Sequence, residues 1–206
     1  MSQRLCLYGI LLSTQGPIPS TFEDFWQMVW ENNTHVIIMV TNLIERGRLK
    51  CDQYWPLEGT QTYGNFEVHL AETAALAHYT VRNFHLRHRS HKGSKHKHRH
   101  ERHERLVHQF HFTEWPDHGT PNHTLPILSF IRKSSATNPE GAGPMVVHCS
   151  AGVGRTGTYI VIDTMFKQIQ DKETINIKGP FTSINNVDNR LNSVMAGFFR
   201  AVGSGK

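Results

Sequence analysis

The apolar positions along the chain predict several strands separated by polar turns and loops. Near-continuous apolar runs at 36–40 and 145–147 are typical of strands that are covered on both faces. Weaker alternation of apolar and polar residues predicts a strand at 66–70. The segments 79–86 and 106–112 predict two further strands that pair across a long connection.

Three segments predict helices. In the first, 22–30, aromatic and apolar residues recur at helical spacing, and Ser20 with Glu23 forms a capping-box pattern that predicts Ser20 as the N-cap. We interpret its aromatic stripe as core rather than as a ligand site. The other two helices are predicted at 123–135, with a proline in the first turn, and at 156–170.

Composition changes this picture little. The 206 residues are 38% hydrophobic and suffice for one globular domain with a sizeable core. No apolar run approaches the roughly 18 residues of a membrane helix, and 1–18 lacks the order of charged, apolar and small residues of a signal peptide. The three cysteines are an odd number, which favours a reducing, cytoplasmic compartment.

The connection 85–108 carries most of the charge. It holds eight Lys or Arg and two Glu, a balance of +6, whereas the whole chain has +5. Seven histidines lie between 85 and 103, but no matching Cys or carboxylate framework accompanies them, so we expect no metal site in the tract. No aromatic residues interleave with the charge, so nucleic acid is not expected either. We interpret the segment as a solvated loop that contacts acidic phosphopeptides or an anionic surface.

The segment 145–163 carries the clearest chemistry: a predicted strand, a loop of small residues from Cys149 to Arg155, and a predicted helix. Backbone amides of such a loop can converge on a phosphate, aided by the helix N-terminus. Arg155 can bind two phosphate oxygens at once. The same positive field favours a thiolate at Cys149, which makes it a nucleophile directed at phosphorus. The alternative is a buried structural cysteine before a glycine turn.

Two other segments are less specific. Trp115-Pro116-Asp117 lies in a turn that can act as a hinge, where Asp117 could donate a proton to a leaving group. A surface turn with an incidental acid would give the same pattern. By composition alone, 45–51 is a charged loop or a solvated hairpin.

The run from His148 to Gly157, His-Cys-Ser-Ala-Gly-Val-Gly-Arg-Thr-Gly, resembles the phosphate-binding loop of the cysteine-dependent protein tyrosine phosphatases. Through Asp163 it is most similar to the receptor-type catalytic domains, the gamma and zeta receptors in particular. The resemblance implies an α/β (α+β) fold with a central twisted mixed β-sheet flanked by helices. It also implies phosphotyrosine-containing proteins as partners, and a place in the cytoplasm, including the intracellular part of a membrane receptor.

The resemblance further assigns roles. Cys149 would attack phosphorus, Asp117 would act as general acid and then base, and Thr156 would donate a hydrogen bond to the sulfur. Arg155 and the loop would stabilise the transferred charge, so no metal or other cofactor is required. The expected phosphate-binding residues are Ser150, Ala151, Gly152, Val153, Gly154 and Arg155, together with Asp117. The expected supporting residues are Glu45, which would pair with Arg155, Lys50 near the acid-bearing loop, His148 and Trp115.

The resemblance weakens at both ends of the chain. We expect an incomplete catalytic domain at 1–178 and a divergent tail at 179–206 with an amphipathic helix pattern. The family segments that set pocket depth and position the hydrolytic water have no match. The alternative function is therefore a catalytically impaired module that traps phosphotyrosine. An arsenate-reductase-like use of the loop is disfavoured by the upstream Trp-Pro-Asp.

Overall fold

The computed structural model describes residues 5–6, 11–89, 104–116 and 123–172. Its main feature is an eight-stranded mixed sheet with the strand order β1-β2-β10-β3-β9-β8-β7-β6. The strands are β1 (Leu5–Cys6), β2 (Leu11–Thr14), β3 (Val36–Met39), β6 (Thr60–Tyr63), β7 (Phe66–Ala75), β8 (Tyr79–His88), β9 (Glu104–Phe112) and β10 (Met145–His148). A separate hairpin pairs β4 (Ile44–Glu45) with β5 (Arg48–Leu49).

The centre of the sheet is parallel and its outer part is antiparallel. β10 pairs in parallel with β2 and β3, and β3 pairs in parallel with β9. From β9 outward, β8, β7 and β6 form an antiparallel meander. The carboxyl ends of β10, β3 and β9 therefore lie at one edge of the sheet, where ligands commonly bind in such sheets.

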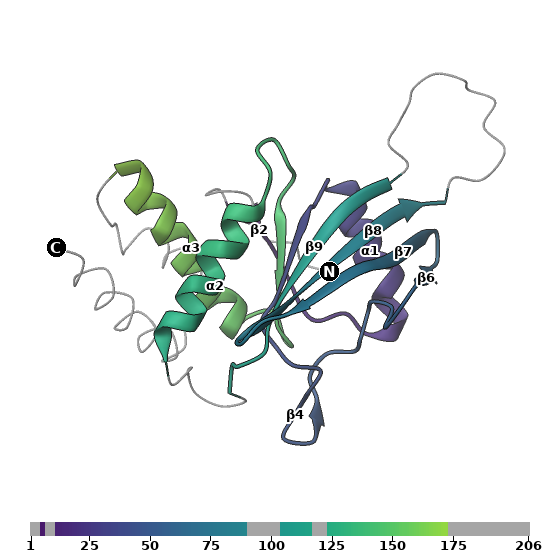
Figure 1. Cartoon of the computed structure of the whole chain (residues 1–206), viewed down its shortest axis with the longest axis horizontal. Coiled ribbons are helices and arrows are strands. Elements are labelled where there is room, and N and C mark those ends of the chain that lie inside the picture. Colours follow the sequence, from purple (N-terminus) through teal and green to yellow (C-terminus); the bar gives the residue numbers. More distant parts are fainter. Residues whose placement is uncertain (1–4, 7–10, 90–103, 117–122, 173–206) are drawn as a thin grey trace.

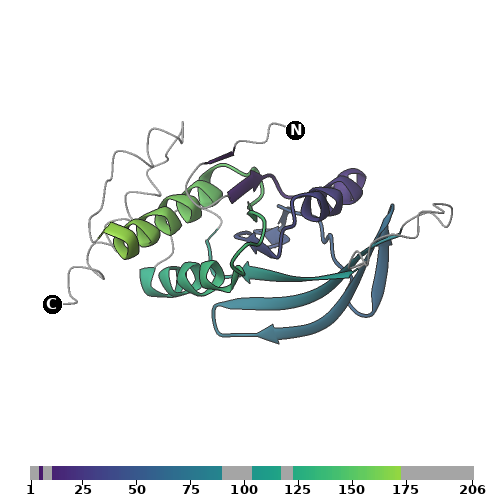
Figure 2. The same ribbon diagram turned by 90° about the horizontal axis from the view of Figure 1, so that it is seen from above.

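Helices cover both faces of the sheet, as Figures 1 and 2 show. Helices α2 (Thr124–Thr137) and α3 (Gly154–Lys172) lie side by side at one end of the molecule and share a core with β3, β9 and β10. Helix α1 (Phe22–Glu31), preceded by the short 3-10 helix η1 (Pro19–Thr21), packs on the opposite face. The aromatic stripe of α1 is core, as predicted, because Phe25, Trp26 and Val29 are fully buried there.

Most predicted elements are confirmed, but the start of α1 was wrong. The helix begins at Phe22 with Thr21 as N-cap, and no side chain caps it. Glu23 does not fold back to a cap. Its carboxylate accepts a hydrogen bond from the backbone amide of Asn65 at 3.1 Å and thereby joins the helix to the β6–β7 turn.

Candidate active site

The loop from Cys149 to Val153 joins the carboxyl end of β10 to the N-terminus of α3. Gly154, Arg155 and Thr156 form the first turn of the helix. The predicted arrangement of strand, small-residue loop and helix N-terminus is therefore present. Cys149 is almost completely buried at 5% exposure, whereas Val153, at 50%, stands at the surface beside it.

The loop is held from behind by β2 and the segment that follows it. The carbonyl of Ser150 accepts a hydrogen bond from the Gly16 amide at 2.9 Å, and the carbonyl of Gly152 accepts one from the Ser13 hydroxyl at 3.1 Å. Gly152 has a φ of +72°, and a Cβ there would lie 2.5 Å from the Thr14 carbonyl oxygen. Only glycine fits both the dihedral and the space. Because the carbonyls of Ser150 and Gly152 are bonded to residues outside the loop, backbone amides of the loop are free to point toward its interior.

Arg155 is fixed by a buried ion pair with Glu45. Its Nη1 donates to Glu45 Oε1 at 2.6 Å and its Nη2 donates to Glu45 Oε2 at 2.8 Å. Nη1 also donates to the carbonyl of Val40 at the end of β3, at 3.3 Å. Both side chains are less than 10% exposed, so the forked contact sets the plane of the guanidinium with little competition from water. The ion pair expected between these two residues is thus present, while its role in catalysis stays a prediction.

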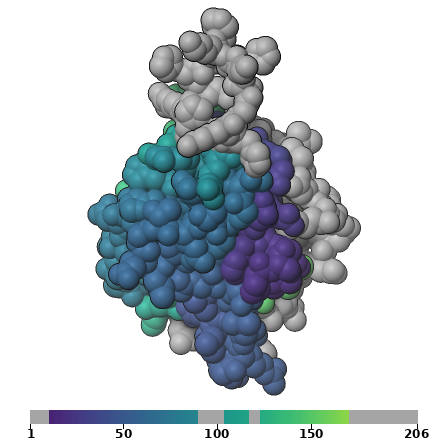
Figure 3. Space-filling model, turned by 90° about the vertical axis from the view of Figure 1, so that its right-hand side faces the viewer, coloured from purple at the N-terminus to yellow at the C-terminus, as the bar shows by residue number. Residues whose placement is uncertain are grey.

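Glu45 reaches Arg155 from a projecting hairpin, which stands out from the body at the lower edge of Figure 3. Arg46 and Gly47 form its turn with positive φ values of 49° and 74°. Ile44 is 64% exposed whereas its neighbour Glu45 is 6% exposed, because successive strand residues point to opposite faces. Lys50 directly follows the hairpin, and its amide donates to the Leu43 carbonyl at 2.8 Å. The segment is therefore a hairpin whose one acidic side chain is directed into the site.

The start of the acid-bearing loop is in contact with the same arginine. Trp115 is buried, and the Arg155 guanidinium carbon lies 6.0 Å from its ring centre. Arg155 Nη2 also donates to the Pro116 carbonyl at 3.0 Å. Asp117, the predicted general acid, lies outside the described residues, as do 90–103 of the basic loop and the tail 179–206. The backbone immediately before Asp117 is nonetheless hydrogen-bonded to Arg155, the predicted phosphate-binding residue.

Behind the cysteine, His148 is a buried neutral imidazole. Burial lowers its pKa to about 4. Gln109 donates to the Tyr54 hydroxyl at 2.8 Å, and this hydroxyl lies 2.8 Å from His148 Nε2, while His148 Nδ1 lies 3.2 Å from the Cys149 carbonyl. A chain in which Tyr54 donates to Nε2 and Nδ1 donates to the carbonyl satisfies every group. The network fixes the backbone at Cys149, the predicted nucleophile.

The contacts of the Cys149 sulfur differ from one expectation. The sulfur accepts a hydrogen bond from the Gly152 amide at 3.2 Å. Thr156, expected to donate to the sulfur, is fully buried, and its hydroxyl has no hydrogen-bond partner among the described residues. The left-handed backbone at Gly152 directs the Gly152 amide at the Cys149 sulfur, so this amide is the donor in place of Thr156. Nearby, burial raises the pKa of Cys51 to about 12, with Asp52 and Cys149 adding to the effect, so this second thiol stays protonated.

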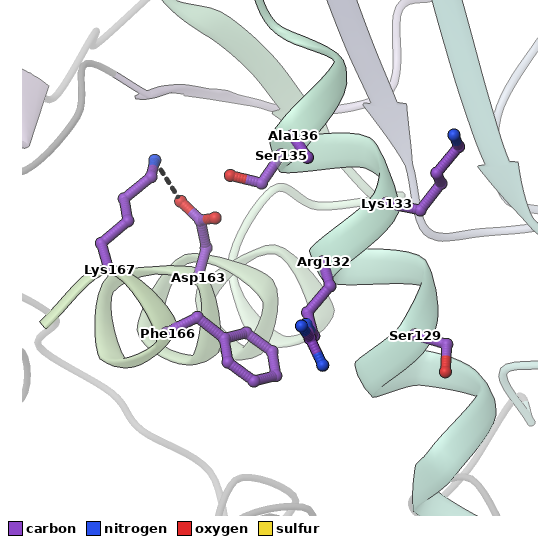
Figure 4. A pocket seen from close by; sticks show the side chains of 8 residues that line it. All are labelled: Ser129, Arg132, Lys133, Ser135, Ala136, Asp163, Phe166 and Lys167. Carbon is purple, nitrogen blue, oxygen red and sulfur yellow. Dashed lines mark hydrogen bonds and ion pairs between the residues drawn. The ribbon is translucent and has the colours of Figure 1, made fainter. Parts of the chain in front are cut away.

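A separate polar pocket of about 520 Å³ lies between α2 and α3 (Figure 4). Its buried acid, Asp163, accepts a hydrogen bond from Lys167 at 2.7 Å. Asp163 follows Arg155 by two helical turns, or roughly 12 Å along α3. The pocket therefore contains none of the predicted site residues.

Comparison with known proteins defines the class. A sequence model of the protein-tyrosine phosphatase family matches residues 10–196. The chain therefore belongs to the protein-tyrosine phosphatase family. The match runs past residue 178, where we placed the end of the catalytic domain.

Several relatives are of the receptor type, as the resemblance indicated. The chain is 52% identical over 180 residues to receptor-type tyrosine-protein phosphatase zeta of Rattus norvegicus, covering 87% of this chain and 8% of that protein. It is 51% identical over 180 residues to receptor-type tyrosine-protein phosphatase F of Mus musculus, covering 87% and 9%. It is 55% identical over 168 residues to tyrosine-protein phosphatase 99A of Drosophila melanogaster, covering 82% and 13%.

The chain thus spans about a tenth of the length of these relatives. Within the part of the chain that the structure describes, no helix combines the length and hydrophobicity needed to cross a membrane.

The sequence did not reveal the residues that hold the loop from behind. Ser13 lies in β2 and Gly16 in the segment after it, and these residues, like Tyr54 and Gln109, come from segments without any chemical pattern. Their roles depend on strand order, which places β2 and β9 near β10. The apolar residues around Gln109 predict a buried strand, and a buried polar side chain needs a hydrogen-bond partner. Its position in this strand was the one available sign that Gln109 takes part in a buried network.

Proposed function

We propose that the chain hydrolyses phosphotyrosine in proteins through a cysteinyl-phosphate intermediate. The observation that carries the proposal is the fixed segment from Cys149 to Arg155, in which the Gly152 amide donates to the Cys149 sulfur at 3.2 Å and Glu45 holds the Arg155 guanidinium. Membership of the protein-tyrosine phosphatase family supports this reaction class. A cytoplasmic site of action is part of the proposal, because the thiolate must stay reduced.

The proposed reaction begins with the phosphoryl group in the loop, held by its amides and by Arg155. The Cys149 thiolate attacks phosphorus, a sulfur–phosphorus bond forms, and the bond to the tyrosine oxygen breaks. Asp117 gives its proton to the departing phenolate. The charge on the equatorial oxygens is stabilised by donors already in place, which lowers the barrier without reorganisation.

In the second step water attacks the cysteinyl phosphate, and Asp117 accepts a proton from this water. The sulfur leaves as thiolate, and inorganic phosphate is released. The Gly152 amide, already directed at the sulfur, stabilises the negative charge that returns to it. A hydrogen bond from Thr156 would add to this only after its hydroxyl turns toward the sulfur.

Pre-steady-state hydrolysis of a phosphotyrosyl peptide tests the proposal. Wild-type protein should show sustained turnover, and Cys149→Ser should show none. Asp117→Ala should lower the rate of phenol release more than it lowers the affinity for the peptide. A circular dichroism spectrum of each variant verifies folding. A stoichiometric burst followed by a stall would instead indicate the phosphotyrosine trap, and a folded wild type that releases no product at all would refute both functions.

A further inference from the structure

Two histidines lie side by side on the exposed face of the antiparallel part of the sheet. His69 in β7 and His85 in β8 are direct partners in the strand register. Their ring centres are 6.3 Å apart and the ring planes differ by 31°. Residues directly opposite on paired strands project to the same face, so the two imidazoles are neighbours because of the register. The segments of β7 and β8, blue to teal in Figure 3, form an open surface there.

Contacts at Nδ1 orient both rings. His85 Nδ1 lies 3.0 Å from Glu104 Oε1, and in the neutral tautomer that carries its proton on Nδ1, the lone pair is on Nε2. His69 Nδ1 lies 2.9 Å from the Thr60 hydroxyl, which can accept in the same way. Within 11–89 and 104–116, neither Nε2 has a hydrogen-bond partner. Histidine metal ligands are typically held by a carboxylate or another acceptor on their second nitrogen.

We propose that His69 and His85 together bind a divalent transition metal ion, of the class of Ni²⁺ and Zn²⁺, through their Nε2 atoms. Imidazole is a preferred ligand of these ions. Metal–nitrogen bonds of about 2.1 Å require the rings to lean toward each other by roughly 1 Å, a small side-chain movement at an exposed position. No group of three or more metal-ligating side chains occurs among the described residues, so water completes the coordination.

The carboxylate of Glu104 is itself fixed, because its Oε2 accepts a hydrogen bond from Arg87 at 3.0 Å. Thr60, His69, His85, Glu104 and Arg87 thus form a continuous row across β6, β7, β8 and β9. A metal ion at the centre of this row would cross-link β7 to β8 and bind only the folded protein. It would therefore raise the melting temperature, and the rise should grow with the ion concentration above the dissociation constant. Histidines that bind the metal in the unfolded chain as well would not have this effect.

The experiment uses the full chain with the tract histidines removed, since these would bind Ni²⁺ by themselves. That background carries glutamine at positions 91, 96, 98, 100 and 103. Calorimetric titration with Ni²⁺ should give one bound ion, and Ni²⁺ should raise the melting temperature. His69→Gln or His85→Gln should each weaken binding at least about tenfold and abolish the thermal shift, and Glu104→Gln should weaken binding by about tenfold. The exposed histidine at the start of α2, changed as His123→Gln, serves as the control and should alter neither.

A background protein that binds no Ni²⁺ would overturn the proposal. So would Ni²⁺ binding that survives both His69→Gln and His85→Gln unchanged, since the ion would then lie elsewhere. Circular dichroism before titration verifies that each protein is folded.

Discussion

Replacing Glu45 with glutamine tests whether the buried ion pair sets the geometry of Arg155, the proposed phosphate-binding residue. Glutamine has nearly the same shape but no charge, and it offers one acceptor oxygen in place of two. Of the contacts at 2.6 Å and 2.8 Å to Arg155, one is lost and the other loses its charge assistance. The guanidinium would then be held by the carbonyls of Val40 and Pro116 and by one neutral oxygen.

The expected magnitude follows from these contacts. A hydrogen bond to a charged group contributes about 1.5–3 kcal/mol, which corresponds to about a 10- to 150-fold loss of kcat/KM if it is expressed in the transition state. Part of the loss should appear in stability, because Arg155 becomes a buried charge without its partner. Glu45→Asp keeps the charge on a shorter side chain and should fall between glutamine and wild type.

The assay is kcat/KM for a phosphotyrosyl peptide, together with urea denaturation of each variant. Glu140→Gln, an exposed carboxylate in the loop before β10, is the matched control and should leave both quantities unchanged. A Glu45→Gln protein with native circular dichroism and wild-type kcat/KM would refute the reasoning, since Arg155 would then be positioned without the ion pair.

Two further predictions concern the loop and the buried histidines. Gly152→Ala places a side chain where φ is positive and the space is filled, so it should lower activity at least about tenfold and stability by about 1–3 kcal/mol. Gly141→Ala, with a φ of 76° and open space around it, should lower stability by about 1 kcal/mol and leave activity intact. Equal effects of the two substitutions on kcat/KM would contradict this prediction. Burial lowers the pKa values of His148 and His111 to about 4, below the usual 6.5, so the unfolded chain binds more protons between these values. Stability should be fully present above pH 6.5 and fall toward pH 4, by up to about 1.4 kcal/mol per pH unit for each histidine; equal urea midpoints at pH 7 and pH 5 would contradict it.

The sequence predicted the elements whose side chains face the two hydrophobic clusters on either side of the sheet. The apolar runs that became β3 and β10 and the spacing that became α1 and α3 are strong signals because both faces of a central strand, or one face of a helix, must be apolar. The strand predicted at 66–70 continues to Ala75 as β7, because its later residues are exposed and are held by pairing with β8. The short edge strand β6 gave no signal, because its first three residues are polar and exposed.

Long-range arrangement is what the sequence could not supply. The sequence of 45–51 was compatible with either a charged loop or a hairpin. The structure contains a hairpin whose Glu45 side chain is buried. The pairing of His69 with His85 depends on register, which a sequence of alternating residues does not fix at an exposed face. The sequence likewise does not show that Glu104 of β9 and His69 of β7 lie beside His85. The histidines of 85–103 alone therefore suggested no metal framework.

The central claim is that Cys149 carries the phosphoryl group during turnover. Acid quenching of the wild-type protein during hydrolysis of a phosphotyrosyl peptide, followed by mass spectrometry of the peptide that contains Cys149, tests it directly. The account predicts a phosphoryl adduct on Cys149 that forms as fast as phenol is released and is absent from Cys149→Ser. Phenol release at the wild-type rate without an adduct, or turnover by Cys149→Ser, would contradict it.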